Sequence, residues 1–150
     1  MEINKSIIEA VTEMFQMFGL NASLIEEVEE SHQFSGDEVN VLIGLADGLK
    51  GNIVLGFKRA TALSIVSAMM GGMEVSDLDF MAKSALGELA NMTIGSAIMK
   101  LMWSEVINLS PPTVVMGEDM TLTLSGNNST RIKFNLNNEI FNIIISTDRV

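Results

Sequence analysis

Three polar side chains stand at helical spacing in the run Ser84-Ala-Leu-Gly-Glu88-Leu-Ala-Asn91. A hydroxyl, a carboxylate and a carboxamide occupy positions i, i+4 and i+7, and on an α-helix these offsets lie on one face. The carboxylate can accept hydrogen bonds, whereas the carboxamide can both accept and donate. A partner can come close to a helix face that is polar and carries no bulky side chains. Ser84, Glu88 and Asn91 therefore form a candidate site.

Glycines and bulky apolar residues occupy separate parts of the same segment. Gly87 and Gly95 lie beside the polar residues, and both are candidate contacts with a partner. The larger side chains point roughly 80–160° away around the 3.6-residue turn: Leu86, Ile94 and Leu101. Each helical glycine costs about 1 kcal/mol relative to alanine, which favours a docking face. A solvated helix face or close packing within the chain are the alternatives.

The balance of charge excludes several classes of partner. The chain has 9 basic and 19 acidic residues and a formal net charge of −10. Proteins that bind nucleic-acid duplexes normally carry the opposite sign, because Lys and Arg must displace condensed counterions. Nucleic acid and anionic membranes are therefore not expected as partners.

Other compositional features narrow the class of protein further. The sequence contains no cysteine, which excludes disulfides, thiolate zinc sites and cysteine nucleophiles, and we expect no metal site. No segment approaches the roughly 18 apolar residues of a membrane span. The first residues also lack a signal-peptide pattern, so we expect a cytoplasmic protein.

Three segments show the apolar spacing of helices. We expect helices over residues 3–18, over Arg59–Met70 and from about Asp77 to Trp103. The last of these is the longest predicted element, and it carries the polar motif. Ser76, with Asp79 three positions later, can cap its N-terminus.

Apolar residues alternate along most of the remaining chain, as expected of half-buried strands. The alternating sets are Val39/Val41/Ile43, Ile53/Leu55/Phe57, Met120/Leu122/Leu124, Ile132/Phe134/Leu136 and Phe141/Ile143/Ile145. Residues 24–33 fit either a strand or a helix. A helix followed by antiparallel strands thus occurs twice. We expect one α+β domain over residues 1–150, with long helices packed on one face of an antiparallel sheet and a pseudo-repeat of helix plus β-meander.

The last predicted strand is apolar on both faces. Ile140, Asn142 and Ile144 occupy the face opposite Phe141 and Ile143. A strand of this kind should not lie open at a sheet edge, because its unpaired backbone would invite association. Pairing with a second subunit would cover it, and we therefore expect a homodimer.

The polar motif and its surroundings resemble the CheC/CheX/FliY family of chemotaxis phosphatases. The family's mark is Asp or Ser, three residues, Glu, two residues, Asn, and Ser84, Glu88 and Asn91 match it. Three further segments resemble the family in the same order: Gly51–Phe57, Met69–Gly71 and Ser110–Gly117. The resemblance covers roughly residues 39–145. A lone Glu-x-x-Asn is common by chance, whereas the ordered set of four is specific. One motif per chain, on the long helix, looks most like the CheX members.

The resemblance implies a phosphatase that acts on the aspartyl phosphate of a CheY-type response regulator. It implies that Asn91 holds the attacking water in line with phosphorus, that Glu88 docks on a lysine of the partner, and that Ser84 supports this face by hydrogen bonding. Mg²⁺ would be supplied by the phosphorylated partner, so no cofactor of the chain's own is expected. CheX-like proteins form homodimers, in agreement with the expectation from the last strand.

Two other classes of function stay open at this point. A non-catalytic interaction or dimerisation module of the same fold, similar to flagellar-switch domains, has no need of the Glu88/Asn91 pair. A small-ligand sensor requires a deep apolar pocket. The 12 methionines are more often adaptable core residues than a binding surface. Met99 and Met102, however, lie near the helix face of the polar motif, where a partner could contact them.

Overall fold

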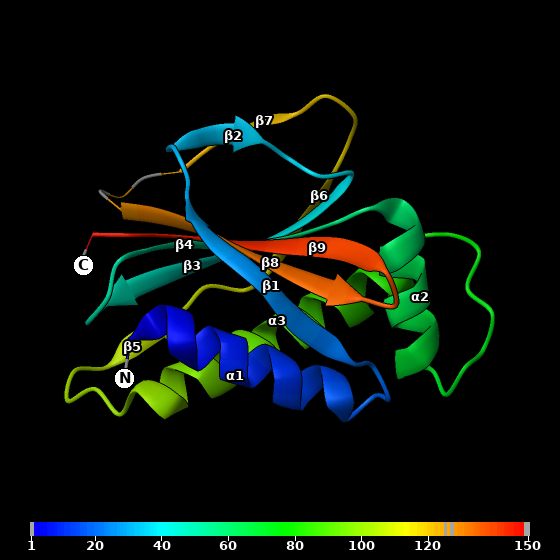
Figure 1. The fold of residues 1–150 in the computed structure, drawn as a ribbon, viewed down its shortest axis with the longest axis horizontal. Coiled ribbons are helices and arrows are strands. Elements are labelled where there is room, and N and C mark those ends of the chain that lie inside the picture. The colour runs from blue at the N-terminus through cyan, green and yellow to red at the C-terminus, as the bar shows by residue number, and fades with distance from the viewer. Residues whose placement is uncertain (1, 125, 127, 149–150) are drawn as a thin grey trace.

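The computed structural model describes residues 2–124, 126 and 128–148. The helices are α1 (Ile3–Gln16), α2 (Arg59–Met69) and α3 (Phe80–Leu101). The strands are β1 (Ala22–Glu29), β2 (Gln33–Ser35), β3 (Val39–Asp47), β4 (Gly51–Phe57), β5 (Ile107–Leu109), β6 (Thr113–Met116), β7 (Thr121–Thr123), β8 (Asn128–Leu136) and β9 (Glu139–Thr147). Figure 1 shows α1 and α3 below the main sheet and the β2–β7 pair above it.

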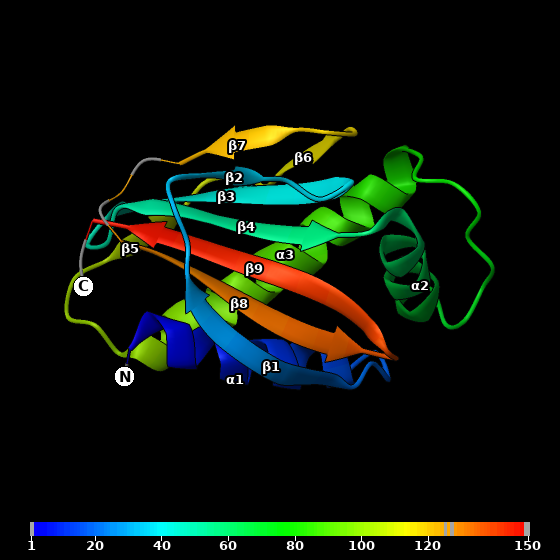
Figure 2. The ribbon, with the colours of Figure 1, turned by 45° about the horizontal axis from the view of Figure 1, so that its top comes forward.

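The main sheet is antiparallel and has seven strands, in the order β1-β8-β9-β4-β3-β5, with β6 also paired to β3 (Figure 2). In the main sheet, strands from the two helix-and-strand repeats pair with each other. β1 of the first half pairs with β8 of the second, and β6 of the second half pairs with β3 of the first. β4 and β9 meet in the middle, where Val54 lies opposite Ile144. The predicted α+β fold is confirmed, with its repeat of helix and antiparallel strands.

A hydrophobic core fills the space between the helices and the main sheet. At its centre, Phe141 of β9 stacks on Phe15 of α1 and on Phe134 of β8, with ring centroids 5.2 and 5.0 Å apart. Phe57 of β4 lies 5.3 Å from the same ring. Aromatic pairs at such distances contribute about 0.5–1.5 kcal/mol beyond the burial of their area. These contacts fix α1 on the sheet, and α3 packs beside α1.

The second face of the sheet is covered by β2 and β7, which pair at Phe34 and Leu122. Phe34 and Leu124 pack against Val54 and Ile144, and all four side chains are buried. The sequence analysis expects a second subunit to protect β9 at a sheet edge, whereas β9 is an interior strand of the main sheet. β9 lies between β8 and β4, and the β2–β7 layer of the same chain covers Ile144 on its second face, whereas Ile140 stays exposed. The apolar character of β9 therefore gives no argument for a homodimer.

Residues 24–33, which fit either a strand or a helix by sequence, lie mostly in β1 at one edge of the sheet. This strand has an irregular register between Leu24 and Glu26. Glu26 forms an ion pair of 3.1 Å with Lys133 of β8. Bulges and charged side chains are features that protect an edge strand from pairing with another sheet.

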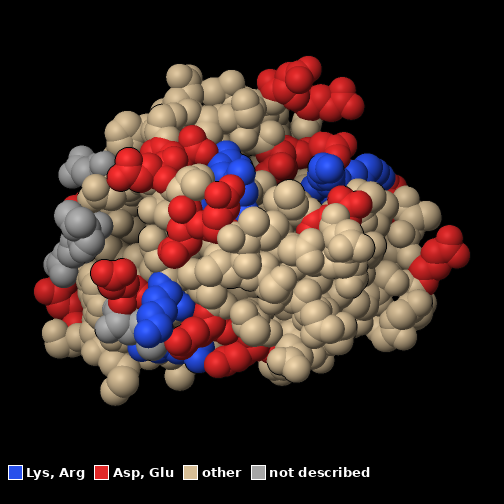
Figure 3. Space-filling view, viewed as in Figure 1, with Lys and Arg blue, Asp and Glu red and all other residues tan. Residues whose placement is uncertain are grey.

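One face of the molecule shows how its charged side chains are distributed (Figure 3). On the face shown in Figure 3, acidic groups are spread widely and the basic ones do not join into a continuous patch. This distribution agrees with the net charge of −10. Among the described residues, no helix has both the length and the apolar character needed to span a membrane.

Candidate functional site

The candidate site lies on α3, whose inner face holds the helix in place. The bulky side chains expected to point away from the motif are all buried: Leu86 and Ile94 lie in the core shared with α1 and the sheet, and Leu101 is buried at the end of the helix. An ion pair also joins the two helices, with Lys100 Nζ 2.9 Å from Glu13 Oε2. The polar motif is thus carried by a helix that is anchored along its opposite side.

The start of α3 differs from the prediction. Its cap is Asp79, whose carboxylate accepts a hydrogen bond of 2.9 Å from the backbone N–H of Ala82. The sequence pattern places Ser76 in this role, which is wrong. Asp77 instead accepts hydrogen bonds from Arg59 and from the backbone N–H that follows it, and this turn keeps Ser76 outside the helix.

The outer face of α3 carries all three motif residues. Ser84 and Glu88 are exposed, and Asn91 is half-buried. Within residues 2–124, 126 and 128–148, none of these side chains makes a hydrogen bond or an ion pair with another residue. The predicted arrangement on one face is therefore observed, but Ser84 supports neither Glu88 nor Asn91 directly. The polar groups of all three are available to water or to a partner.

The two glycines of α3 lie in different surroundings. Gly87 is buried, and a Cβ atom added to it would lie 3.2 Å from Pro112 Cγ. Packing within the chain therefore accounts for Gly87. Gly95 is half-buried, and an added Cβ would meet no neighbouring atom of the described residues within 4 Å. Packing against the described part of the chain therefore does not require a glycine at position 95.

Exposed methionines extend the outer face beyond the motif. Met99 and Met102, which the sequence places near the motif, are 80% and 89% exposed. Met81 is 62% exposed, and the sequence-based interpretation missed it. Its position three residues before Ser84 is the signal that could have found it, since i and i+3 share a helix face.

The arrangement of polar groups limits the chemistry that the site can perform. The chain's single histidine, His32, lies in the β2–β7 layer, where its carbonyl oxygen accepts a hydrogen bond from Leu124. It is on the other side of the sheet from Ser84, so a Ser-His nucleophile is not formed. In the described part of the chain, no three His, Asp or Glu residues form a group able to hold a metal ion. Glu88 and Asn91 can orient water and polar groups that a partner brings.

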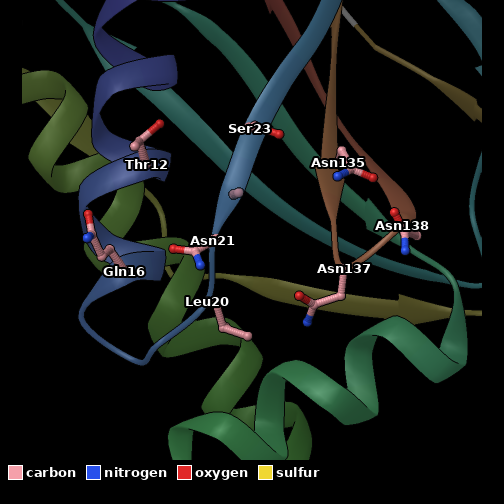
Figure 4. Close-up of a pocket in the computed structure, with 9 residues that line it drawn as sticks. Thr12, Gln16, Leu20, Asn21, Ser23, Asn135, Asn137 and Asn138 are labelled. Carbon is pink, nitrogen blue, oxygen red and sulfur yellow. The ribbon is translucent and has the colours of Figure 1, made fainter.

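A cavity of about 320 Å³ lies apart from the motif (Figure 4). It is bounded by the end of α1, the start of β1 and the turn between β8 and β9. Most of its lining side chains are hydroxyls or carboxamides, and the lining residues are Thr12, Gln16, Leu20, Asn21, Ala22, Ser23, Asn135, Asn137 and Asn138. Small-molecule pockets are usually lined by apolar and aromatic side chains. This cavity therefore does not favour a small-ligand sensor.

Fold and site together define a class: an α+β domain that presents a polar motif on an exposed helix rather than in a cavity. Residues 39–135 match the family described as the chemotaxis phosphatase CheX. This match covers more than half of the chain, and the chain belongs to the CheX family.

Individual relatives agree with this assignment. A protein of Thermotoga maritima named CheY-P phosphatase CheX is 46% identical over 86 residues, a stretch that covers 57% of this chain and 56% of that relative. The fold matches the crystal structure of CheX from Desulfovibrio desulfuricans with a TM-score of 0.84 and 25% identity, over 98% of this chain and 99% of the other. It also matches the CheX-CheY-BeF₃-Mg²⁺ complex from Borrelia burgdorferi with a TM-score of 0.84 and 23% identity, over 99% of each chain.

Proposed function

We propose that this chain accelerates the hydrolysis of the aspartyl phosphate on a CheY-type response regulator. The position of Glu88 and Asn91, one turn apart on an exposed helix face and unbonded to other described residues, carries the proposal. Membership of the CheX family supports it. The name of the Thermotoga relative and the CheX-CheY complex from Borrelia support the choice of substrate.

The proposed reaction needs little covalent chemistry from this chain. A water oxygen attacks phosphorus, the bond between phosphorus and the aspartyl oxygen breaks, and inorganic phosphate and a free carboxylate are released. Since an acyl phosphate is already activated, catalysis consists mainly of placing the water in line. Asn91 suits this task, because its carbonyl oxygen can accept from the water while its amide donates.

The other motif residues hold the partner in register. The Glu88 carboxylate meets a lysine beside the partner's phosphoryl group, a charge-assisted contact that fixes distance and direction. Ser84, one turn before Glu88, supports the same face through hydrogen bonds to the partner or to ordered water. Gly95 lets the partner approach the backbone of α3 closely, whereas Gly87 is already covered by Pro112.

The metal ion of this reaction belongs to the substrate. The Borrelia complex includes BeF₃ and Mg²⁺ together with CheX and CheY. We assign Mg²⁺ here to the phosphorylated regulator as well, and no cofactor to this chain. The proposal places the chain in the cytoplasm with its substrate, as a single domain over residues 1–150. It also retains a homodimer, on the strength of the family resemblance alone.

Phosphate release from a phosphorylated CheY-type regulator tests the proposal. The rate is measured with the wild-type chain, with Asn91→Ala and with no added chain. Asn4→Ala serves as a matched control, because Asn4 is also a half-buried helical asparagine, on α1. We expect acceleration by the wild type and by the control, and a loss of about 10²–10³ in rate for Asn91→Ala.

Two outcomes contradict the proposal. If the wild type binds the regulator but leaves the rate of phosphate release unchanged, the chain is a non-catalytic interaction module of the same fold. If Asn91→Ala is as active as the wild type, the chain is a phosphatase but Asn91 does not place the water.

A further inference from the structure

Two exposed methionines bracket the motif on α3. Met81 precedes Glu88 by seven residues and Met99 follows it by eleven. At 100° per residue, both side chains therefore lie about 20° around the helix from Glu88, on the same side. They are about 27 Å apart along the axis. The outer face of α3 thus has a polar centre and an exposed apolar group at each end.

We propose that Met81 and Met99 are the apolar anchors that hold the response regulator on α3. They set the strength of binding, while the motif between them acts on the phosphoryl group. The inference rests on the proposed function and adds to it the contacts that provide affinity.

The motif itself is poorly suited to provide that affinity. Burial of a carboxylate, a carboxamide and a hydroxyl costs free energy unless each finds a polar partner. With a net charge of −10, the chain gains no long-range attraction toward an anionic phosphoryl site. Burial of apolar surface is favourable whatever the net charge, and methionine adapts its shape to the surface that it meets.

Met81 and Met99 stay exposed, and packing among the described residues gives no reason for two apolar side chains at these positions. Both lie on the side of α3 opposite its buried face. Methionine is enriched in protein–protein interfaces relative to the rest of the surface. Met102 differs from these two, since it follows the last helical residue with a left-handed backbone and a φ of 53°.

Charge distinguishes a regulator from a second copy of this chain as the occupant of this face. On the outer face of α3, Glu88 lies between Met81 and Met99 and carries a negative charge. If two copies of the chain met symmetrically through the outer face of α3, their Glu88 carboxylates would lie close together without a cation between them. That arrangement is unfavourable. A regulator that offers a cationic group beside its phosphoryl group neutralises Glu88 and leaves the methionines to bury apolar surface.

The test is steady-state release of phosphate from a phosphorylated CheY-type regulator, measured first with the wild-type chain and then with its variants. The variants are Met81→Ala, Met99→Ala and the double variant, with Met17→Ala as control. Met17 is 69% exposed and lies at the end of α1. We expect the double variant to raise KM about 10–100-fold with kcat changed less than about threefold, and Met17→Ala to change neither. Met81→Leu with Met99→Leu should retain most of the binding, because it keeps the apolar area.

Several outcomes overturn the inference. An unchanged KM in the double variant shows that the methionines are not anchors, and a loss of kcat alone shows a different role. If sedimentation shows that the wild type is a dimer and the double variant a monomer, a second copy of the chain occupies the outer face of α3. Absence of any acceleration by the wild type removes the proposed function itself. Failure of the proposed function is measured with the wild type alone, whereas failure of the inference is measured with the variants. The two failures are therefore distinguishable.

Discussion

Gly87 of α3 lies directly against Pro112, in the segment that leads into β6. A Cβ added to this glycine would lie 3.2 Å from Pro112 Cγ, whereas one added to Gly95 would meet no atom within 4 Å in the part of the chain that the structure describes. The first glycine therefore allows the motif helix to pack close to the rest of its own chain. The second exposes helical backbone about one turn after Asn91, on the face that we propose for docking.

Gly95→Ala is expected to stabilise the chain and to weaken its binding to the regulator. Alanine is more favourable than glycine in a helix by about 1 kcal/mol, and the added methyl meets no atom of the described residues within 4 Å. Urea denaturation should show a free energy of unfolding higher by about 0.5–1 kcal/mol. The added methyl should raise KM for the regulator, because it occupies the surface that the partner approaches.

Gly87→Ala is the matched control for this prediction. It makes the same change in the same helix, but Pro112 must give way by a few tenths of an ångström. Crowding then offsets the gain in helix propensity, so its stabilisation should be smaller than that of Gly95→Ala. Equal stabilisation by both changes, with no effect of either on KM, would contradict the distinction between the two glycines.

Asn91→Asp separates the shape of the side chain from its hydrogen-bonding groups. The variant keeps the size of asparagine but replaces the donor amide with an acceptor and adds a negative charge beside an anionic phosphoryl group. We expect kcat to fall by about 10²–10³, while the free energy of unfolding changes by less than about 0.5 kcal/mol, as for other surface positions. Activity close to that of the wild type would mean that Asn91 acts only through its acceptor oxygen.

Glu88→Gln tests whether charge or hydrogen bonding determines docking. Glutamine keeps the length and an acceptor oxygen but loses the ionic contribution of a charge-assisted contact. We expect KM to rise about tenfold relative to the wild type at low salt, and the difference to shrink as salt screens an exposed pair. The measurement is KM for the phosphorylated regulator at two salt concentrations. A ratio that does not depend on salt would indicate that no cation meets Glu88.

The long elements and the motif could be predicted because they depend on local spacing. The face shared by Ser84, Glu88 and Asn91 follows from helical periodicity alone, and so does the burial of Leu86 and Ile94 on the other side. Spacing could not distinguish Gly87 from Gly95. The two glycines differ because Pro112 lies against Gly87. Pro112 is 25 residues further along the sequence than Gly87, and only the tertiary structure brings it beside the helix.

The position of β9 could not be predicted for a similar reason. Its cover consists of β2 and β7. The alternation of Met120, Leu122 and Leu124 predicts β7, but β2 has only three residues and shows no pattern of its own. They meet through pairs such as Phe34 and Leu122, which are remote in sequence. A strand that is apolar on both faces is therefore compatible with an interior position as well as with a subunit interface.

Asp37 provides a prediction that concerns stability rather than activity. Its half-buried carboxylate lies against Gly56 of β4, where an added Cβ would collide with it. Burial raises the pKa of Asp37 above its ordinary value, and this outweighs the lowering by a hydrogen bond from Asn142 and by the charge of Arg131. The folded chain therefore holds this proton to higher pH than the unfolded chain does.

The sign of the pH dependence follows from that difference. Between the ordinary and the raised pKa of Asp37, the native state binds more protons than the unfolded state, so this group lowers stability as pH rises and the loss persists at higher pH. Asp37→Asn removes the titration. Its free energy of unfolding relative to the wild type should therefore increase from pH 4 to pH 7, measured by urea denaturation. Glu118→Gln, which removes an exposed carboxylate, is the control. A relative stability of Asp37→Asn that is constant or falls with pH would show that its neighbours, rather than burial, determine the proton affinity of Asp37.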